Sequence, residues 1–349
     1  MVKIPVNLLK QSAYRPVVRS RASVLIIALW SLCLLATFAV MLGYNVIQKA
    51  ALVKRLEERA KLGLIAEAGV RQAIALLQEP GKSYDSFTDP WSNNINAFKN
   101  VPLGEGVFNI EYEYTDWQSG RKQSNYGLID EERKLNINKA QASVLERLFR
   151  FLLNCDEGLA RDLAACVIDW RDSDSDLSMP LGGAEDHYYK NLDYPYEAKD
   201  ADFEVLDELL LVKGFDQKSY EKVKDYITVY GSGYVNVNTA DMPVFVALGL
   251  DEDIAANIIA FRLGSDGIAG TADDNFFETT YDVAAKMMSF ASLSPSQIQQ
   301  LDNIAGQNLT TKSNNFMIRC RANLEKRKYT TTVESIVDRT GKVLYWSQI

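Results

Sequence analysis

The longest apolar pattern in the chain begins close to the amino terminus. From Val24 to Gly43 the sequence carries no charged residue, and about 20 residues are enough to cross a bilayer core of about 30 Å as a helix. Beyond this run, apolar side chains recur at helical spacing from Leu52 to Leu77 among Lys, Arg and Glu, and no proline follows until Pro80. The pattern predicts one helix from about Val24 to Gln78, with its first half in a membrane and its second half on a globular domain.

Positive charge precedes the apolar run. Residues 1–22 contain no acidic residue and carry five basic ones, Lys3, Lys10, Arg15, Arg19 and Arg21. This asymmetry predicts that the amino terminus stays in the cytoplasm. The small residues Ala22 and Ser23 stand before the apolar run, whereas a secretory signal peptide ends in a small-residue cleavage site beyond it. Cleavage between Ala22 and Ser23 is one interpretation, and an ordinary uncleaved signal anchor is the other.

Strand patterns flank a long block of helical patterns. Val107 to Tyr114 alternates apolar and polar residues, which is the period of a half-buried strand. Residues 80–104 are polar and loop-like, and helical patterns with acidic loops dominate from Leu135 to about Asn308. Further extended runs lie at 125–129, 315–322, 328–338 and 343–348. The predicted fold class is therefore α+β, with a large α-helical domain inserted into a small antiparallel sheet on which the long amino-terminal helix packs.

The helical block contains a repeat. The segment LNINKA, from Leu135 to Ala140, recurs 100 residues later as VNVNTA from Val235 to Ala240. Further on, Asp156–Arg171 parallels Asp251–Arg262, and an acidic loop follows each copy. Each copy predicts a short strand or bend, an asparagine that caps a helix, and two helices. The repeat predicts a duplicated packing unit.

Each repeat copy also resembles the helix-hairpin-helix modules of competence DNA receptors. Those modules bind phosphate through backbone amides of a Gly-hydrophobic-Gly turn, aided by nearby Lys or Arg. Here the glycine pair is missing, and carboxylates stand at the turns, with Asp156 and Glu157 in the first copy and Asp251, Glu252 and Asp253 in the second. Phosphate binding depends on cationic neutralisation, so the sequence predicts the hairpin fold without nucleic-acid binding.

The charge balance agrees with this interpretation. The chain has 38 basic and 46 acidic residues, a net charge of −8. Without the five basic residues of the leader, 33 basic residues remain against 46 acidic ones, a net charge of −13. Such a surface repels nucleic-acid backbones and acidic lipid.

The acidic loop after the first repeat copy has the pattern of an oxygen-ligand metal site. Alternate carboxylates on a turning backbone repel one another unless a cation neutralises them, and oxygen ligands on flexible loops suit Ca²⁺. The spacing begins like an EF-hand loop but has Leu177 in place of its glycine and Gly183 in place of its glutamate. The predicted calcium ligands of this loop are Asp172, Asp174, Asp176, Glu185 and Asp186. The alternative is a solvated acidic loop.

A second acidic loop occupies the matching place after the second repeat copy. It combines glycines for tight bends with three predicted ligands, Asp266, Asp273 and Asp274. The same two interpretations, a second calcium site and a solvated loop, apply to it.

The sequence gives little support for an enzymatic function. His187 is the single histidine, so a His-rich metal site is excluded and a His-based triad would rest on one loop residue. Gly81-Lys82-Ser83 lacks the earlier glycine and the preceding strand of a P-loop. No catalytic residue is predicted, and a carboxylate-pair hydrolase is the weaker alternative.

Cys155 and Cys166 either form a disulfide across a helical hairpin or are two buried free thiols.

Several segments together resemble one known family. The chain carries RASVLIIALW at Arg21–Trp30, GGAEDHYY opening the stretch Gly182–Phe215, GSGYVNVNTA at Gly231–Ala240 and KVLYW at Lys342–Trp346. In this order they resemble the minor pseudopilin K family of type II secretion systems, over nearly the whole chain. The departures are Ala22, where that family typically has glycine, and His187, where an acidic or neutral residue is more usual.

The resemblance implies a type IV pilin-like plan. Its expected parts are a leader peptide (1–22), a transmembrane half-helix (23–43), a pilin-like helix with the first strands (44–134), an inserted α-helical domain (135–313) and carboxyl-terminal strands (314–349). It also implies calcium in the helical domain, cleavage by a prepilin peptidase between Ala22 and Ser23, and methylation of Ser23.

The function implied is that of a structural subunit that supports protein export. The resemblance places it at the pseudopilus tip with the minor pseudopilins I and J above the major pseudopilin, in the inner membrane with most of the chain in the periplasm. The fifth mature position, where major subunits usually carry Glu, is Ile27 here. The alternative is a pilin-like DNA-uptake or adhesive tip protein that binds through its helix-hairpin-helix-like units.

Overall fold

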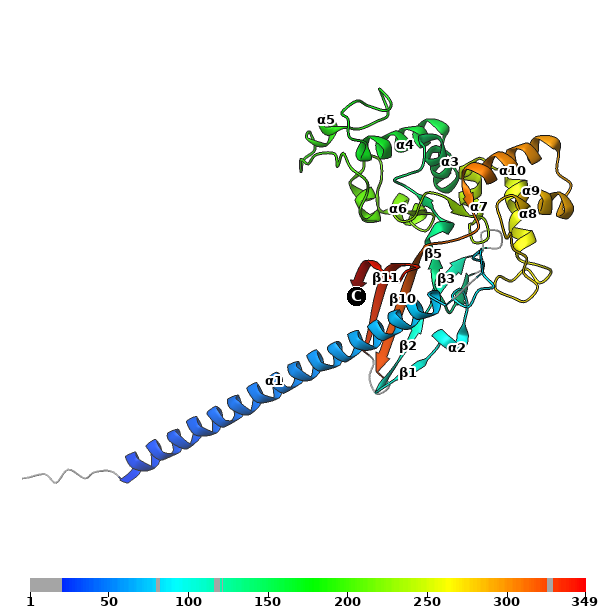
Figure 1. Cartoon of the computed structure of the whole chain (residues 1–349). Coiled ribbons are helices and arrows are strands. Elements are labelled where there is room, and N and C mark those ends of the chain that lie inside the picture. The colour runs from blue at the N-terminus through cyan, green and yellow to red at the C-terminus, as the bar shows by residue number, and fades with distance from the viewer. Residues whose placement is uncertain (1–20, 80–81, 116–119, 121, 325–328) are drawn as a thin grey trace, which may run out of the picture. The chain divides into compact units, whose positions relative to one another are not determined.

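The computed structural model of the chain describes residues 21–79, 82–115, 120, 122–324 and 329–349 (Figure 1). Most of the predicted leader, residues 1–20, lies outside the described residues. The chain divides into two compact units, Met1–Ala60 and Lys61–Ile349, and each is described by itself below.

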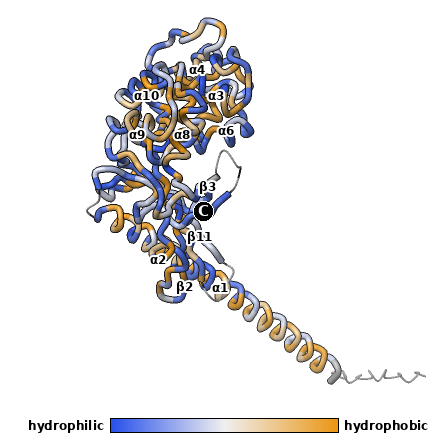
Figure 2. Tube along the Cα trace, turned by 90° about the vertical axis from the view of Figure 1, so that its right-hand side faces the viewer, coloured by the Kyte–Doolittle hydropathy of each residue, from blue (hydrophilic) through white to orange (hydrophobic). Residues whose placement is uncertain are grey.

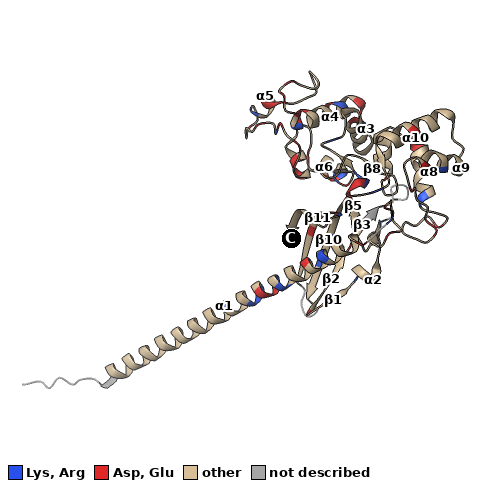
Figure 3. Ribbon diagram, viewed as in Figure 1, with Lys and Arg blue, Asp and Glu red and all other residues tan. Residues whose placement is uncertain are grey.

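The predicted long helix is confirmed. Helix α1 spans Arg21–Leu77, 57 residues, and ends close to the predicted boundary at Gln78. The first half of α1 is apolar, as the orange tube in Figure 2 shows, and its large apolar side chains are exposed. From Ser23 on, the charged residues begin only in the second half of the helix (Figure 3). Among the described residues, one helix, Ser23–Leu77, is long and apolar enough to cross a membrane by length and composition.

The few hydroxyl groups of the apolar run bond within the helix. Ser31 Oγ donates to the carbonyl of Ile27 at 2.9 Å, and Thr37 Oγ1 donates to the carbonyl of Leu34 at 2.8 Å. A hydroxyl bonded in this way presents no unpaired donor, which is what a lipid environment requires.

The second unit contains an antiparallel six-stranded sheet. Its strand order is β1-β2-β10-β11-β12, and β5 pairs with β10 beside β2. The three carboxyl-terminal strands lie where the sequence predicts them, because their alternation of apolar and polar residues continues through each strand. The strands span β1 Val101–Leu103, β2 Gly106–Ile110, β5 Ile129–Asp130, β10 Asn315–Leu324, β11 Thr330–Asp338 and β12 Val343–Gln348.

The carboxyl-terminal part of α1 packs on this sheet. Apolar residues three or four apart on the helix form one stripe that meets the buried faces of β2 and β10, as predicted for an amphipathic half-helix. Burying each large side chain here contributes about 1.5–3 kcal/mol. The stripe consists of Leu62, Ala66, Val70, Ala73 and Leu77, and the strands contribute Phe108, Ile110, Phe316, Ile318 and Cys320.

The predicted strand from Val107 to Tyr114 is wrong as a single element. The chain bends at Glu111, so that β2 belongs to the main sheet and β3, Tyr112–Thr115, forms a separate hairpin with β4, Lys122–Asn125. The alternating pattern continues through both strands, and only the choice of pairing partner separates them.

The prediction of a structureless loop over 80–104 is also wrong in part. This region contains the short helix α2, Ile95–Phe98, and strand β1. The Asn94 side chain caps α2 by accepting from the amide of Ala97 at 3.1 Å, and Phe98 is fully buried. Elements of three and four residues are too short to leave a periodic pattern, so tertiary packing decides them.

The inserted helical block has a hydrophobic core of its own. Two parallel two-stranded ribbons, β6 with β7 and β8 with β9, lie at the start of the two repeat copies. The strands are β6 Leu135–Asn136, β7 Ile227–Thr228, β8 Val235–Asn236 and β9 Leu309–Thr310. The helices are η1 Glu131–Arg133, α3 Ala142–Leu153, α4 Glu157–Arg171, α5 Asp186–Tyr189, η2 Leu206–Leu211, α6 Gln217–Val223, α7 Met242–Leu248, α8 Glu252–Arg262, α9 Asp282–Phe290 and α10 Pro295–Gln307.

The expected asparagine helix caps are wrong. The residues at the N-cap positions of α3 and α7 are Gln141 and Asp241. Asn136 and Asn236 instead fold back on their own strands, because each Oδ1 accepts the backbone N–H two residues on, at 2.8 and 2.9 Å. Such local bonds are typical of asparagine at turns.

The second asparagine of each copy holds a distant loop. Asn138 accepts from the N–H of Phe203 at 2.8 Å and donates to its carbonyl at 2.9 Å. Asn238 makes the same two bonds with the backbone of Phe277, at 2.8 and 2.9 Å. The repeat therefore preserves a specific long-range contact as well as a helical pattern.

Candidate metal site

The first acidic loop brings three carboxylates together. Asp172 follows the last residue of α4, Asp174 lies two residues further, and Glu185 immediately precedes α5. One carboxylate oxygen from each of these residues lies within 4.8 Å of the others. Asp172 and Glu185 are 13 positions apart in the sequence, so the loop between α4 and α5 has to close for them to meet.

The electrostatics of this group favour the binding of a cation. Burial raises the pKa of Glu185 to about 7, and the charges of Asp169 and Asp172 add to the effect. Burial and then the charge of Asp174 also raise the pKa of Asp172. In addition, Glu185 Oε1 and Asp172 Oδ1 are buried without a hydrogen-bond partner. Oxygen atoms in this condition are what a hard cation such as Ca²⁺ coordinates.

A buried residue that the sequence analysis missed closes the loop. Asp169 on α4 is fully buried, and its two oxygens accept from the backbone N–H groups of Ser178 and Ala184, each at 2.8 Å. Position 183 requires glycine, because a Cβ there would lie only 2.0 Å from Asp169 Oδ2 and would clash with it. Asp169 precedes Asp172 by one helical turn, and this spacing is the signal that could have revealed it.

The carboxyl-terminal side of the loop contributes another acidic neighbour. The charge of Asp200 raises the pKa of both Asp172 and Glu185, which places its carboxylate near the group. Its backbone N–H donates to the carbonyl of Trp170 at 3.1 Å. Asp200 lies too far along the chain for the spacing of the loop to indicate it.

Two of the predicted ligands do not join the group. Asp176 is exposed, and its backbone N–H donates to Asp174 Oδ1 at 2.9 Å. Asp186 turns to Lys190, whose Nζ lies 2.7 Å from its Oδ2, and accepts from the N–H of Ala198 at 2.9 Å. These bonds lower the pKa of Asp186, so its charge already has partners. The local charge pattern does not distinguish a carboxylate that faces the site from one that faces away.

The second acidic loop also gathers its three predicted ligands. Oxygens of Asp266, Asp273 and Asp274 lie within 4.8 Å of one another. Here, however, Asp273 Oδ2 accepts from the N–H and the hydroxyl of Ser265, both at 2.7 Å, and these bonds help to lower the pKa of Asp273. Asp274 Oδ2 accepts from the N–H of Gly270 at 2.7 Å. Because hydrogen bonds already stabilise these carboxylates, a cation would stabilise the second loop less than the first.

The cysteines are free thiols in the structure. Of the two alternatives for Cys155 and Cys166, a disulfide or two thiols, the structure has the thiols. Cys166 Sγ lies 3.2 Å from the carbonyl of Gly182, and burial raises the pKa of this thiol to about 12. Such a thiol is unreactive at neutral pH.

The hairpin turns offer little to phosphate. Asp156 caps α4, and its Oδ1 accepts the N–H of Leu159 at 3.0 Å. The carboxylate therefore occupies the end of the helix where a phosphate would have to bind, and its charge repels one.

Comparison with known proteins points to one family. Residues 106–232, about a third of the chain, match the family model described as type II secretion system protein K. The fold is similar to that of GspK in the crystal structure of the GspK–GspI–GspJ complex from the enterotoxigenic Escherichia coli type 2 secretion system. The TM-score is 0.62 at 18% identity, over 85% of this chain and 97% of that chain. No curated protein matches the chain.

At this identity the solved structure establishes the fold alone, and the family model matches residues 106–232. The long amino-terminal helix and small antiparallel sheet with a helical insertion agree with both. Residues 106–232 therefore match type II secretion system protein K, and the fold of the chain is similar to that of GspK.

Proposed function

We propose that this chain is the subunit at the tip of the pseudopilus, a structural component of protein export rather than an enzyme. The observation that carries the proposal is the helical block inserted between β5 and β10 of the pilin-like sheet. A block with its own core, repeated on every subunit, would clash along a thin fibre. A single copy at the end of the fibre meets no such neighbour.

The membrane-spanning half of α1 supports the same position. Major subunits carry a carboxylate at the fifth mature position, where it neutralises the terminal amine of a neighbouring subunit, and this chain has Ile27 there. A carboxylate in the apolar part of a membrane is unfavourable unless it is neutralised, and the cost reaches roughly 2.5–3.5 kcal/mol at the centre of a bilayer. A subunit with no neighbour above it gains by carrying an apolar residue at this position.

The proposed partners are minor pseudopilins of the I and J types, with the major pseudopilin below them. Support comes from the fold of GspK, which was crystallised with GspI and GspJ. The proposed location is the inner membrane, crossed once by α1, with the bulk of the chain in the periplasm. A prepilin peptidase would remove the leader on the cytoplasmic side.

Quantitative mass spectrometry of isolated fibres tests the tip position. We expect a very low ratio of this chain to the major subunit, and antibody label at fibre ends only. A near-equal ratio, or label along the whole fibre, would refute the proposal. Co-purification with the I- and J-type subunits, but not with the major subunit alone, tests the choice of partners.

We also propose that the first acidic loop binds Ca²⁺ through Asp172, Asp174 and Glu185. The two unpaired buried oxygens of this group support the proposal. The second loop is a weaker proposed site, because its carboxylates already accept hydrogen bonds. In both loops the metal would fix a surface segment of the helical block.

Thermal unfolding in Ca²⁺ and in chelator tests the first site. At a hundredfold excess over Kd, bound Ca²⁺ adds about 2.7 kcal/mol to the free energy of unfolding. Glu185→Gln should abolish most of this gain, whereas the matched control Asp176→Asn, outside the group, should keep it. Equal melting temperatures of the unmutated protein with Ca²⁺ and with chelator would show that the loops are only solvated.

A further inference from the structure

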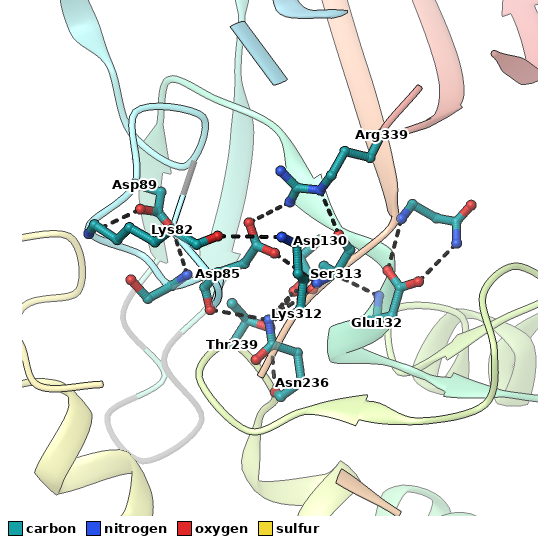
Figure 4. Close-up of polar contacts among 12 residues, drawn as sticks. Lys82, Asp85, Asp89, Asp130, Glu132, Asn236, Thr239, Lys312, Ser313 and Arg339 are labelled. Carbon is teal, nitrogen blue, oxygen red and sulfur yellow. Dashed lines mark hydrogen bonds and ion pairs between the residues drawn. The ribbon is translucent and has the colours of Figure 1, made fainter. Parts of the chain in front are cut away.

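A second group of acidic side chains lies where the chain passes between the sheet and the helical block (Figure 4). The chain leaves the sheet at the end of β5 and enters η1 directly, and it returns through the segment between β9 and β10. Four carboxyl groups at this crossing are at most 3% exposed. We call Asp85, Asp130, Glu131 and Glu132 the junction cluster.

Two members of the junction cluster have a cationic partner. Arg339, which follows β11, donates through Nη2 to Asp85 Oδ1 and through Nε to the carbonyl of Ser313 at 3.0 Å. Lys134 Nζ lies 2.6 Å from Glu131 Oε1. The negative charge of each of these two carboxylates is therefore balanced.

Asp130 has no cation within ion-pairing distance among the described residues, but neutral donors surround it. Its Oδ2 accepts from the Thr239 hydroxyl at 2.6 Å, the Ser313 hydroxyl at 2.7 Å and the Asn236 amide at 3.0 Å. Its Oδ1 accepts from the backbone N–H of Glu132 at 2.8 Å. A carboxylate that accepts four hydrogen bonds is stabilised in its ionised form.

Glu132 is the member of the junction cluster whose negative charge is compensated least. Its oxygens accept from the backbone N–H of Asn315 at 3.0 Å and from the Asn315 side chain at 2.8 Å. The described part of the chain shows no ion pair to it, and the charge of Asp130 lies close by. On its other side stands Gly231, where a Cβ would come within 3.0 Å of Glu132 Oε1. Glu132 thus bonds the first residue of β10 and lies beside a loop of the helical block.

The surroundings leave Glu132 as the proton-bearing member. Burial, and then the charge of Asp130, raise the pKa of Glu132 to about 8, while the bonds from Asn315 act in the opposite direction. Burial also raises the pKa of Asp130, and the charge of Asp85 adds to the effect. We assign the proton to Glu132 because Asp130 accepts more hydrogen bonds. The other titratable or charged groups around the junction are Lys82, Asp85, Asp89, Glu131, Arg133, Lys134, Tyr230, Asp241, Lys312 and Arg339.

We propose that Glu132 is a proton-dependent latch that holds the inserted helical block to the pilin-like sheet. With a proton on Glu132, the junction buries one negative charge fewer, and Asn315 and the Gly231 loop close over it. Once Glu132 ionises, its charge faces that of Asp130 without a cation, and the junction opens to admit water. The latch belongs to the junction cluster and is independent of the tip position and of calcium.

The direction of the pH dependence follows from the linkage of proton binding to opening. A carboxyl group with a raised pKa in the closed state binds more protons there than in the open state. Its stabilising contribution is complete below the ordinary glutamate value of 4.5 and is lost as the pH rises through about 8. Between pH 6.0 and 7.5 the opening equilibrium should therefore increase about twentyfold.

Amide hydrogen exchange on the detergent-solubilised full chain tests the latch. We expect the protection of residues 129–136 and 309–316, corrected for the intrinsic pH dependence of exchange, to fall about twentyfold from pH 6.0 to 7.5. Glu132→Gln should remove this pH dependence and keep the segments protected, since a glutamine carbonyl still accepts from Asn315, whose own amide can turn to accept in return. In Glu131→Gln, the matched control, the fall should persist because Glu132 is intact.

Two results would overturn the proposal. One is protection of these segments that does not change with pH in the unmutated chain. The other is the same pH dependence in Glu132→Gln as in the unmutated chain, which would assign the titration to another group. If Glu132→Gln fails to fold, Asn315→Ala offers a second test, because loss of its amide donor should move the fall in protection to higher pH. An unmoved or lowered midpoint in Asn315→Ala would also count against the latch.

Discussion

The packing of α1 on the sheet depends on Gly69, where the helix comes close to the strands. A Cβ on Gly69 would lie 2.5 Å from Cys320 Sγ and 2.9 Å from Cδ2 of Phe108. Cys320 is fully buried on the central strand β10, and Phe108 is 2% exposed, so neither side chain has free space to move into. Gly63, six residues earlier on the same helix, would place its Cβ 3.3 Å from the end of the Gln348 side chain, which is exposed.

These two glycines predict opposite effects of the same substitution. Alanine is favoured over glycine in a helix by about 1 kcal/mol. At Gly69 overpacking costs roughly 1–3 kcal/mol, and the sub-van-der-Waals distance to Cys320 places the cost at the upper end of that range. Gly69→Ala should therefore destabilise the protein by about 1–2 kcal/mol. Gly63→Ala should stabilise it by about 0.5–1 kcal/mol, because the flexible Gln348 side chain can move aside.

Urea unfolding of a fragment that begins after the apolar run, at Tyr44, measures both effects. Far-ultraviolet circular dichroism follows the transition, and each change in stability should shift the urea midpoint with the m value unchanged. The double variant Gly69→Ala/Cys320→Ala removes the sulfur atom and should recover part of the loss caused by Gly69→Ala. The reasoning is refuted if both glycine substitutions shift stability in the same direction, or if Cys320→Ala gives no recovery.

Two further predictions concern the leader and the repeat. Mass spectrometry of the first peptide of the mature chain should find Ser23 as a methylated amino terminus, and recovery of Met1, or of a terminus beyond Gly43, would contradict this. Asn138→Ala and Asn238→Ala should each lower the free energy of unfolding by about 2–4 kcal/mol, because each leaves a backbone N–H and carbonyl unpaired, at Phe203 and at Phe277 respectively. Urea unfolding checks both, and a large loss in one copy only would show that the two contacts are not equivalent.

The periodic elements of this protein follow from the sequence alone. Helix α1 and the strands β10, β11 and β12 lie close to their predicted bounds, because each is long enough for its apolar pattern to repeat several times. The repeat at an offset of 100 residues and the two acidic loops are equally visible, since they depend on residue types at fixed spacing. The resemblance to the pseudopilin K family rests on the same local segments.

Side-chain partners across the fold were decided by tertiary structure. The spacing of the first acidic loop does not reveal that Glu185 turns inward while Asp186 turns to Lys190, nor that Asp169 closes the loop from α4. The predicted asparagine caps are wrong for the same reason, because a side chain that caps a helix and one that bonds a distant backbone, as Asn138 and Asn238 do, have the same sequence signal.

The junction cluster is the clearest case of a feature that only folding creates. Asp85 and Arg339 are more than 250 residues apart, and Asp130 meets Asn236 and Thr239 from one distant segment and Ser313 from another. In the sequence these residues look like ordinary polar residues of loops and turns. Burial gives them their chemistry, because the energy of an ionised carboxylate depends on the donors, charges and water around it. Local patterns fix none of these, so the site appears only when the sheet and the helical block come together.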